Sequence, residues 1–174
     1  MAPPAIIDLK AIDFSQVVAN KEAIRQVLPQ RHEMEQLDAI VHCDKETGLI
    51  IGYKDVRPDE FWIKGHLPGF PVLPGVLICE CAAQLCSYHA LTQTIIQGDF
   101  IAFGGLENVR FRSMVNPGNR LVMVGKAGKI NRRQMNYSVQ GFVDDSLVFH
   151  GDILGLAVNW AVKENGAGTE PARG

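Results

Sequence analysis

The longest apolar run of the chain, Val72–Leu91, is interrupted by Glu80, Gln84 and His89. A helix that lies on a protein surface shows a polar stripe along one side. Over Val76 to about Gln93, apolar residues would instead cover nearly all sides of a helix. The pattern therefore predicts one long helix that the rest of the chain encloses.

Shorter apolar runs and alternating patterns on both sides of this helix predict β-strands. Before the helix, residues 39–43 and 49–53 flank a polar turn that ends in Gly48, which is typical of a hairpin. After the helix, turn signals such as Gly104-Gly105 separate further candidates. These strands are expected at residues 100–103, 106–111, 121–130, 134–142 and 147–158.

Near the N-terminus, apolar positions between Gln16 and Leu28 predict a second helix. Asp13 or Ser15 would cap its start, and the proline that follows Leu28 would end it. Asn20 could instead divide this segment in two. The segment is therefore expected to be helical, either as one helix or divided at Asn20.

The order of these elements predicts the fold class. A sheet that curls around one helix buries that helix on all sides, which gives an α+β fold. We expect a single domain at residues 23–162, preceded by a loose N-terminal extension at residues 1–22. Residues 163–174 contain several glycines and few apolar residues, and we expect a disordered tail there.

The composition of the 174 residues, with 47% hydrophobic and 21% charged residues and a net charge of -2, is typical of a globular domain. No basic block stands out, so nucleic acid is not an expected partner. The apolar run is too interrupted for a membrane span, and the N-terminus does not resemble a signal peptide, so we expect a cytoplasmic protein. Cys79 and Cys81 point to different faces of the helix, which favours buried thiols over a metal site.

A histidine and a glutamate stand out within the central stretch. His66 precedes the helix in a loop that Pro68, Pro71 and Pro74 make stiff. Glu80 lies inside the apolar helix, where a charged group is costly unless it is paired or neutralised. This conflict between a charged residue and its apolar surroundings indicates a functional site.

Gln84 lies one helical turn after Glu80 on the same face. The helix start offers the free N–H groups of Gly75 and Val76, and the missing side chain of Gly75 would let a carbonyl oxygen approach. His66 could take a proton from the carbon beside that carbonyl, and Glu80 could protonate a leaving hydroxyl. These parts suit β-elimination of water from a 3-hydroxyacyl thioester, with an apolar groove for the acyl chain.

The residue types alone leave other interpretations open. A histidine in a loop is often a surface residue that forms ordinary hydrogen bonds. A glutamate in an apolar helix is often paired with a structural arginine or lysine. Gln84 alone could serve to satisfy backbone groups.

The central stretch resembles the signature of the 3-hydroxyacyl-[acyl-carrier-protein] dehydratases. In this chain it reads Gly65-His66-Leu67-Pro68-Gly69-Phe70-Pro71, then Pro74-Gly75-Val76-Leu77, then Glu80-Cys81-Ala82-Ala83-Gln84. The similarity extends over about residues 24–158. It implies a hotdog fold, with an antiparallel sheet wrapped around one long helix, in homodimers that often assemble three to a hexamer. Glutamate at position 80 indicates the plain dehydratase branch, because the dehydratase/isomerase branch has aspartate there.

The resemblance also implies roles for individual residues. His66 of one subunit would act as the acid/base for the α-proton, and Glu80 of the other subunit would act on the β-hydroxyl. The N–H of Gly75 would hold the thioester carbonyl, and Gln84 would orient Glu80. The residues expected to bind substrate are Gly75, Val76, Gln84, Phe70 and Phe103. The family implies no metal and no other cofactor, and its partner is acyl carrier protein bearing the acyl thioester.

The chain also departs from the family pattern. Leu67 replaces a phenylalanine, Gln30 replaces a histidine, and Asn119 replaces an aspartate. The segment His32–Ala39 is much more polar than its family counterpart, which bears on substrate and carrier recognition. Two alternatives on the same fold are an acyl-thioester hydrolase and a non-catalytic acyl-binding protein, although a binding groove alone needs no acid–base pair.

Overall fold

The computed structural model describes residues 2–94 and 96–160. The helices are η1 (Leu9–Ala11), α1 (Lys21–Val27), η2 (His32–Met34) and α2 (Gly75–Thr92), where η marks a 3-10 helix. The strands are β1 (Ala19–Asn20), β2 (Ala39–Asp44), β3 (Leu49–Asp55), β4 (Phe100–Phe111), β5 (Arg120–Ile130), β6 (Gln134–Val143) and β7 (Ser146–Val158).

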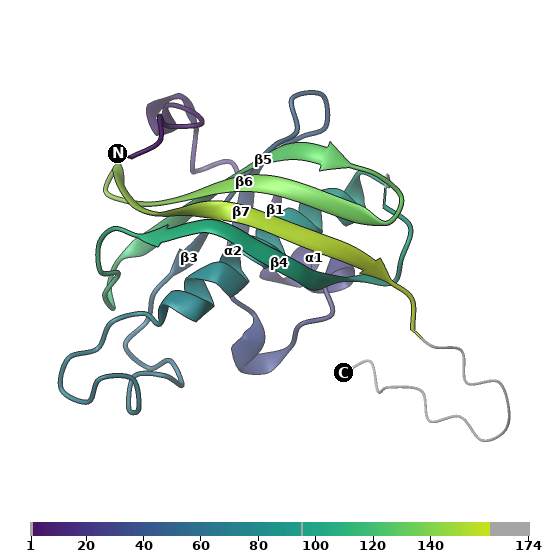
Figure 1. Ribbon diagram of the computed structural model, residues 1–174. Coiled ribbons are helices and arrows are strands. Elements are labelled where there is room, and N and C mark those ends of the chain that lie inside the picture. The colour runs from purple at the N-terminus through teal and green to yellow at the C-terminus, as the bar shows by residue number, and fades with distance from the viewer. Residues whose placement is uncertain (1, 95, 161–174) are drawn as a thin grey trace, which may run out of the picture.

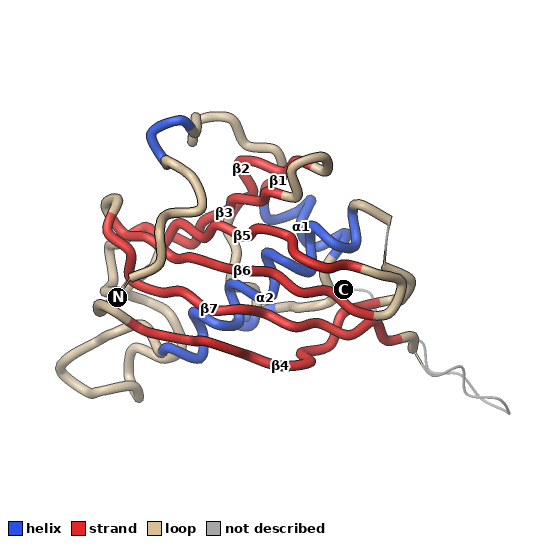
Figure 2. The backbone as a smooth tube through the Cα atoms, turned by 45° about the horizontal axis from the view of Figure 1, so that its top comes forward, coloured by secondary structure: helices blue, strands red, loops and turns tan. Residues whose placement is uncertain are grey.

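The seven strands form one antiparallel sheet in the order β1-β2-β3-β5-β6-β7-β4 (Figure 1). The sheet curves around α2, which lies behind β5, β6 and β7 in the view of Figure 2. This arrangement confirms the predicted α+β fold, in which an antiparallel sheet encloses one long helix as in the hotdog fold. No helix in the described part of the chain is long and apolar enough to cross a membrane.

The long helix α2 is buried as its apolar pattern predicts, with 12 of its 18 residues buried. Its cysteines Cys79, Cys81 and Cys86 are buried free thiols, and burial raises the pKa of each. His89 is also buried, and burial lowers its pKa. Its Nε2 lies 3.3 Å from the Asp44 carbonyl, which can only accept, so Nδ1 accepts from the Tyr137 hydroxyl at 2.5 Å.

The helix expected at 16–28 is shorter than predicted. Asn20 pairs with Ala39 as part of β1, and its side chain then caps α1 by accepting from the Ala23 N–H at 2.9 Å. Asparagine is a strong N-cap because its side chain satisfies a free N–H of the first turn. The helix therefore begins at Lys21, and neither Asp13 nor Ser15 caps it.

The predicted break at Gly104-Gly105 is wrong, because β4 runs through it as one strand. The pairing with β7 shifts between Phe103 and Gly105, which marks a β-bulge. A Cβ on Gly104 would lie 3.0 Å from Leu156 Cγ, so glycine allows the close approach at this bulge. The glycine pair therefore bends a strand that pattern reading divides in two.

The N-terminal extension is not loose over its described residues. The Gln140 side chain accepts from the Ile6 N–H and donates to the Pro4 carbonyl, both at 2.8 Å. Leu9 is buried in a second apolar cluster with Val41, Leu49, Ile51, Val124 and Phe142. Neighbouring strand residues point to opposite faces, and Ile40 and Ile50 pack in the main core, so this segment covers the face opposite α2. The tail predicted at 163–174 lies outside the described residues.

Candidate active site

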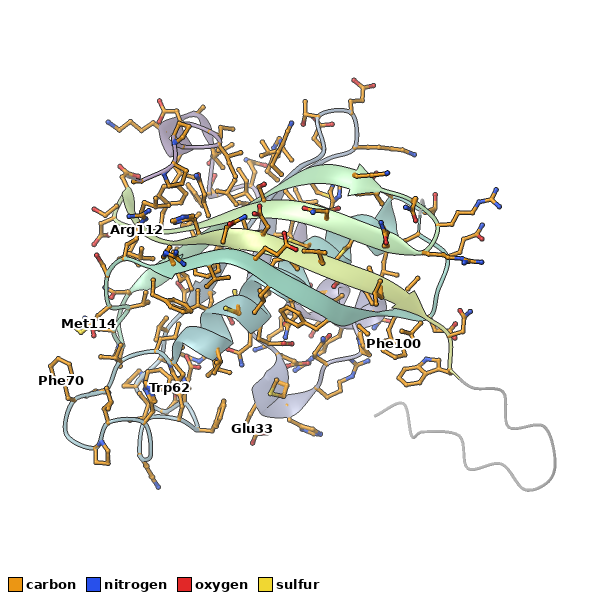
Figure 3. The ribbon with its side chains drawn as sticks, viewed as in Figure 1. Glu33, Trp62, Phe70, Phe100, Arg112 and Met114 are labelled. Carbon is orange, nitrogen blue, oxygen red and sulfur yellow. The ribbon has the colours of Figure 1, made fainter. Side chains whose placement is uncertain are left out.

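His66 lies in the loop between β3 and α2, where its backbone N–H donates to the Trp62 carbonyl at 2.8 Å. Trp62 anchors this loop in the core, whereas Phe70 stands at its outer end (Figure 3). The Nδ1 of His66 lies 2.8 Å from the Val72 carbonyl oxygen. Because a carbonyl oxygen only accepts, Nδ1 carries the hydrogen and Nε2 keeps its lone pair. The imidazole is thus oriented, and within the described part of the chain no group bonds to its Nε2.

Glu80 is partly exposed in the second turn of α2, and its carboxylate accepts from the Gln84 amide at 2.7 Å. The Gln84 side chain is buried, at 2% exposed. Its oxygen accepts from the Gln36 N–H at 2.9 Å, and its nitrogen also donates to the Met34 carbonyl at 2.6 Å. These two backbone partners fix the orientation of the amide. Gln84 therefore orients Glu80 from the buried side of the helix. It does not line an open surface, as a substrate-binding residue would.

The polar segment His32–Ala39 is the source of these backbone partners. Its Met34 and Gln36 flank the Gln84 amide, and the Cys81 thiol donates to the Gln36 carbonyl at 3.4 Å. The segment thus packs against α2 beside Glu80. Sequence reasoning missed this contact, because no local pattern links backbone groups to a side chain almost fifty positions away.

The start of α2 presents the N–H groups of Gly75 and Val76. The first intrahelical bonds run from Leu77 and from the following residue to the Pro74 carbonyl, so the two preceding N–H groups have no partner within the helix. Val76 is 75% exposed. The expectation for Gly75 needs a correction, because a Cβ there would lie 2.8 Å from the ring of Phe111. The missing side chain makes room for that ring rather than for a ligand on that side.

The apolar residues expected to bind substrate lie on the surface of the single chain. Phe70 is 58% exposed on the loop, and Phe103 is 46% exposed on β4. Leu106 and Phe111 are further exposed apolar residues of the same strand. Among the described residues, no hydrogen bond joins His66 to Glu80. The described part of one chain therefore presents the two predicted site groups and an apolar surface, and it forms no closed site around them.

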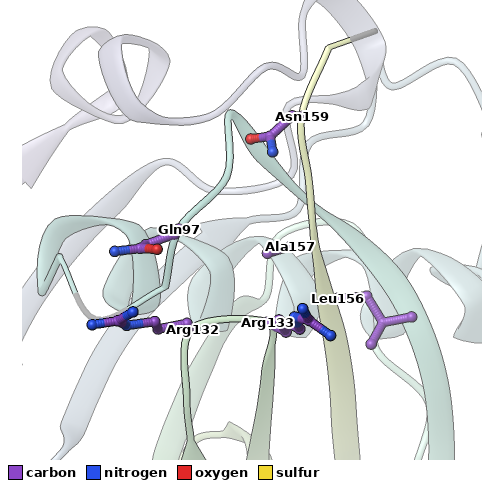
Figure 4. A pocket seen from close by; sticks show the side chains of 6 residues that line it. All are labelled: Gln97, Arg132, Arg133, Leu156, Ala157 and Asn159. Carbon is purple, nitrogen blue, oxygen red and sulfur yellow. The ribbon is translucent and has the colours of Figure 1, made fainter.

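One cavity lies away from these residues. It has a volume of about 580 Å³, and it is lined by Gln97, Arg132, Arg133, Leu156, Ala157 and Asn159 (Figure 4). Gln97 follows the C-terminal end of α2, whereas Glu80 lies near its N-terminal end. The cavity contains none of the predicted site residues. Within the described ranges, no three side chains gather that could hold a metal ion.

Comparison with known protein families identifies relatives of the chain. Residues 28–152 match the model of the FabA-like domain family. The 3-hydroxyacyl-[acyl-carrier-protein] dehydratase FabZ of Lawsonia intracellularis is 35% identical over 149 residues, which cover 84% of this chain and 95% of that protein. The protein of the same name from Desulfotalea psychrophila is 36% identical and covers 75% of this chain and 88% of its own length.

Solved structures share the fold at low sequence identity. The dehydratase heterocomplex ApeI:P from Xenorhabdus doucetiae has a TM-score of 0.65 at 14% identity, over 77% of this chain and 90% of that one. Cj0977, a sigma28-regulated virulence protein from Campylobacter jejuni, has a TM-score of 0.62 at 14% identity, over 88% of this chain and 100% of that one. These similarities concern the fold alone.

Proposed function

This chain belongs to the FabA-like family of 3-hydroxyacyl dehydratases, and on that premise we propose that it removes water from 3-hydroxyacyl thioesters on acyl carrier protein. The product is a trans-2-enoyl thioester for fatty acid or related acyl-chain biosynthesis. The observation that carries the proposal is that the chain contains both an oriented imidazole and a carboxyl group that a neighbouring amide fixes in place. The Nε2 of His66 has no hydrogen-bond partner among the described residues, and Glu80 accepts a hydrogen bond from Gln84.

The reaction uses these groups in a simple sequence. The Nε2 of His66 takes the proton from the α-carbon, and the electron pair moves toward the thioester carbonyl. The free N–H groups at the start of α2 stabilise the negative charge on that oxygen. Glu80 gives its proton to the β-hydroxyl, the carbon–oxygen bond breaks and water leaves. Gln84 keeps the carboxyl group in place during this transfer.

A homodimer completes the site in this proposal. Strand β4 is an edge of the sheet, and its exposed Phe103, Leu106 and Phe111 form an apolar surface beside unpaired backbone groups. A second copy that covers this surface brings its own loop beside the first copy's helix. His66 of one subunit then works with Glu80 of the other, and Phe70, Val76 and Phe103 line the acyl groove. Three such dimers could form a hexamer.

The proposed partner is acyl carrier protein, and the proposed location is the cytoplasm. The curated relatives are named for a substrate carried on this protein. Exposed basic residues such as Lys64 and Arg110 offer charges for an acidic carrier. The four free thiols suit a reducing compartment.

The test compares acid–base variants with matched controls. His66→Ala and Glu80→Gln are each expected to lower turnover by about two to four orders of magnitude, because each removes a group that transfers a proton. The measurement is the appearance of enoyl absorbance from 3-hydroxydecanoyl-acyl carrier protein. His42→Ala and Glu46→Gln change the same residue types away from the site and should turn over like wild type.

Two results would overturn the assignment. Activity that survives both site variants would remove His66 and Glu80 from the mechanism. Release of free thiol without enoyl product would identify an acyl-thioester hydrolase instead.

A further inference from the structure

Gln30 reaches the Glu80 carboxylate from a part of the chain 50 residues earlier. It follows α1, and its Nε2 lies 3.5 Å from Glu80 Oε1. This distance is long for an N–H···O bond, and catalytic hydrogen bonds often shorten only when substrate is bound. Glu80 therefore has amide neighbours on two sides, Gln84 from its own helix and Gln30 from the end of α1.

The orientation of the Gln30 amide follows from its surroundings. If its oxygen faced the carboxylate, two acceptors would oppose each other, so its nitrogen is the atom that faces Glu80. The oxygen points to the other side, where it is buried and has no donor among the described residues. A cavity of about 10 Å³ adjoins the side chain and is lined in part by Glu35 and Gln84. That volume fits about one water molecule, which would donate to the Gln30 oxygen.

The backbone around Gln30 is held by the next residue. The Arg31 guanidinium donates to the carbonyls of Leu28 and Gln30, both at 2.7 Å, and to that of Arg25 at 3.1 Å. The Arg25 carbonyl belongs to the last turn of α1, where carbonyls lack partners within the helix, and the other two carbonyls follow the helix. Pro29 further restricts the chain just before Gln30. The backbone of Gln30 is thus fixed, and its side chain extends toward Glu80.

We propose that Gln30 is a positioning residue for Glu80, and this inference rests on the proposed dehydratase function. When Glu80 gives its proton to the leaving hydroxyl, its oxygen becomes negatively charged. A hydrogen bond from an amide is stronger to a carboxylate than to a neutral acid. The Gln30 contact therefore strengthens as the reaction proceeds, which lowers the barrier without adding to substrate binding.

The kinetic test separates turnover from binding. Gln30→Met keeps a side chain of similar length without hydrogen-bonding groups. Its kcat is expected to fall about three- to thirtyfold, with KM within about twofold of wild type, because the lost bond acts on the reacting state. Gln30→His restores an N–H donor and should regain most of kcat. Gln26→Met makes the same change on the exposed face of α1 and should match wild type.

A second measurement does not depend on turnover. The side-chain amide signals of Gln30 in a ¹⁵N NMR spectrum should shift in Glu80→Gln relative to wild type, whereas those of Gln26 should not. Unchanged Gln30 signals, or a Gln30→Met variant with wild-type kcat, would overturn this inference. A wild-type protein that forms no enoyl product would overturn the proposed function, so the two failures are distinguishable.

Discussion

The buried ion pair between Lys54 and Glu60 shows how single residues hold the loop that carries His66. The two charged groups are 2.9 Å apart, and their side chains are 2% and 7% exposed. Burial pushes the pKa of Glu60 upward, but hydrogen bonds from Lys54, the Arg57 N–H and Trp62 outweigh it and lower the pKa. Trp62 donates to the Glu60 carboxylate, and its carbonyl accepts from the His66 N–H. The ion pair therefore helps to fix the position of His66 through Trp62.

Replacing Lys54 with Met is expected to destabilise the fold by about 3–5 kcal/mol, because it leaves the buried Glu60 carboxylate without its positively charged partner. The measurement is denaturant-induced unfolding at pH 7, with the exposed Lys45→Met as the matched control. Equal stability of the two variants would contradict the prediction.

The pair should also make stability depend on pH. A carboxyl group whose pKa is lowered by folding contributes fully above its unfolded pKa, near 4.5, and this contribution is lost as pH falls through the folded value. Wild type should therefore lose stability below about pH 4.5. Lys54→Met should lose less over the same range, because protonation neutralises its unpaired carboxylate. Unfolding midpoints at about pH 7 and pH 3.5 test this difference.

At the scale of elements, the N-terminal segment acts as a cover for one face of the sheet. Leu9 in η1 packs on apolar residues of β2, β3, β5 and β6. Gln140 ties the preceding residues to β6 through two hydrogen bonds. Without this cover, an apolar face opposite α2 would be open to water. The segment therefore packs against the sheet although it lies before the family match.

Leu9→Ala is expected to lower the free energy of unfolding by about 2 kcal/mol, since it removes most of a buried side chain at the edge of the core. Val18→Ala is the matched control, because Val18 is 59% exposed and its truncation should change stability little. Both variants are compared by denaturant unfolding. Identical midpoints for Leu9→Ala and wild type would show that the segment does not stabilise the sheet.

At the scale of the whole molecule, the proposed site is shared between two copies of the chain. The exposed edge of β4 and its apolar side chains offer a surface on which a second copy can pack. A two-fold dimer uses the same surface on both copies. If the imidazole comes from one copy and the carboxyl group from the other, activity belongs to the dimer and not to the chain.

Mixed dimers test this sharing directly. His66→Ala and Glu80→Gln chains are each expected to be inactive alone, but in the proposed arrangement a dimer with one of each contains one site with both native groups. Because one of its two sites is native, the mixed dimer should show about half of wild-type turnover. If both groups came from the same chain, every mixed site would lack one of them and no activity would return. The measurement is enoyl formation by the co-purified pair, identified with two affinity tags.

Much of the fold follows from local patterns in the chain. The helix α2 is apolar on nearly all sides, so its burial was predictable. Local patterns failed where a distant contact decides the outcome. The pattern at Gly104 predicts a turn, but the residue lies in a β-bulge, because β7 pairs with β4 there and the two strands approach closely. Asn20 is expected inside a helix, but it caps the start of α1, because β2 pairs with Ala19 and Asn20 and keeps them in a strand.

The sequence by itself determined the buried helix, the stiff loop before it and the spacing of His66 and Glu80, because all of these depend on residues close together in the chain. The tertiary structure decided how the site is held. The Val72 carbonyl selects the tautomer of His66, and the segment around Gln36 orients Gln84. Gln30 reaches Glu80 across 50 positions. Such contacts arise only when the chain folds, since hydrogen bonds depend on distance in space and not on position in the sequence.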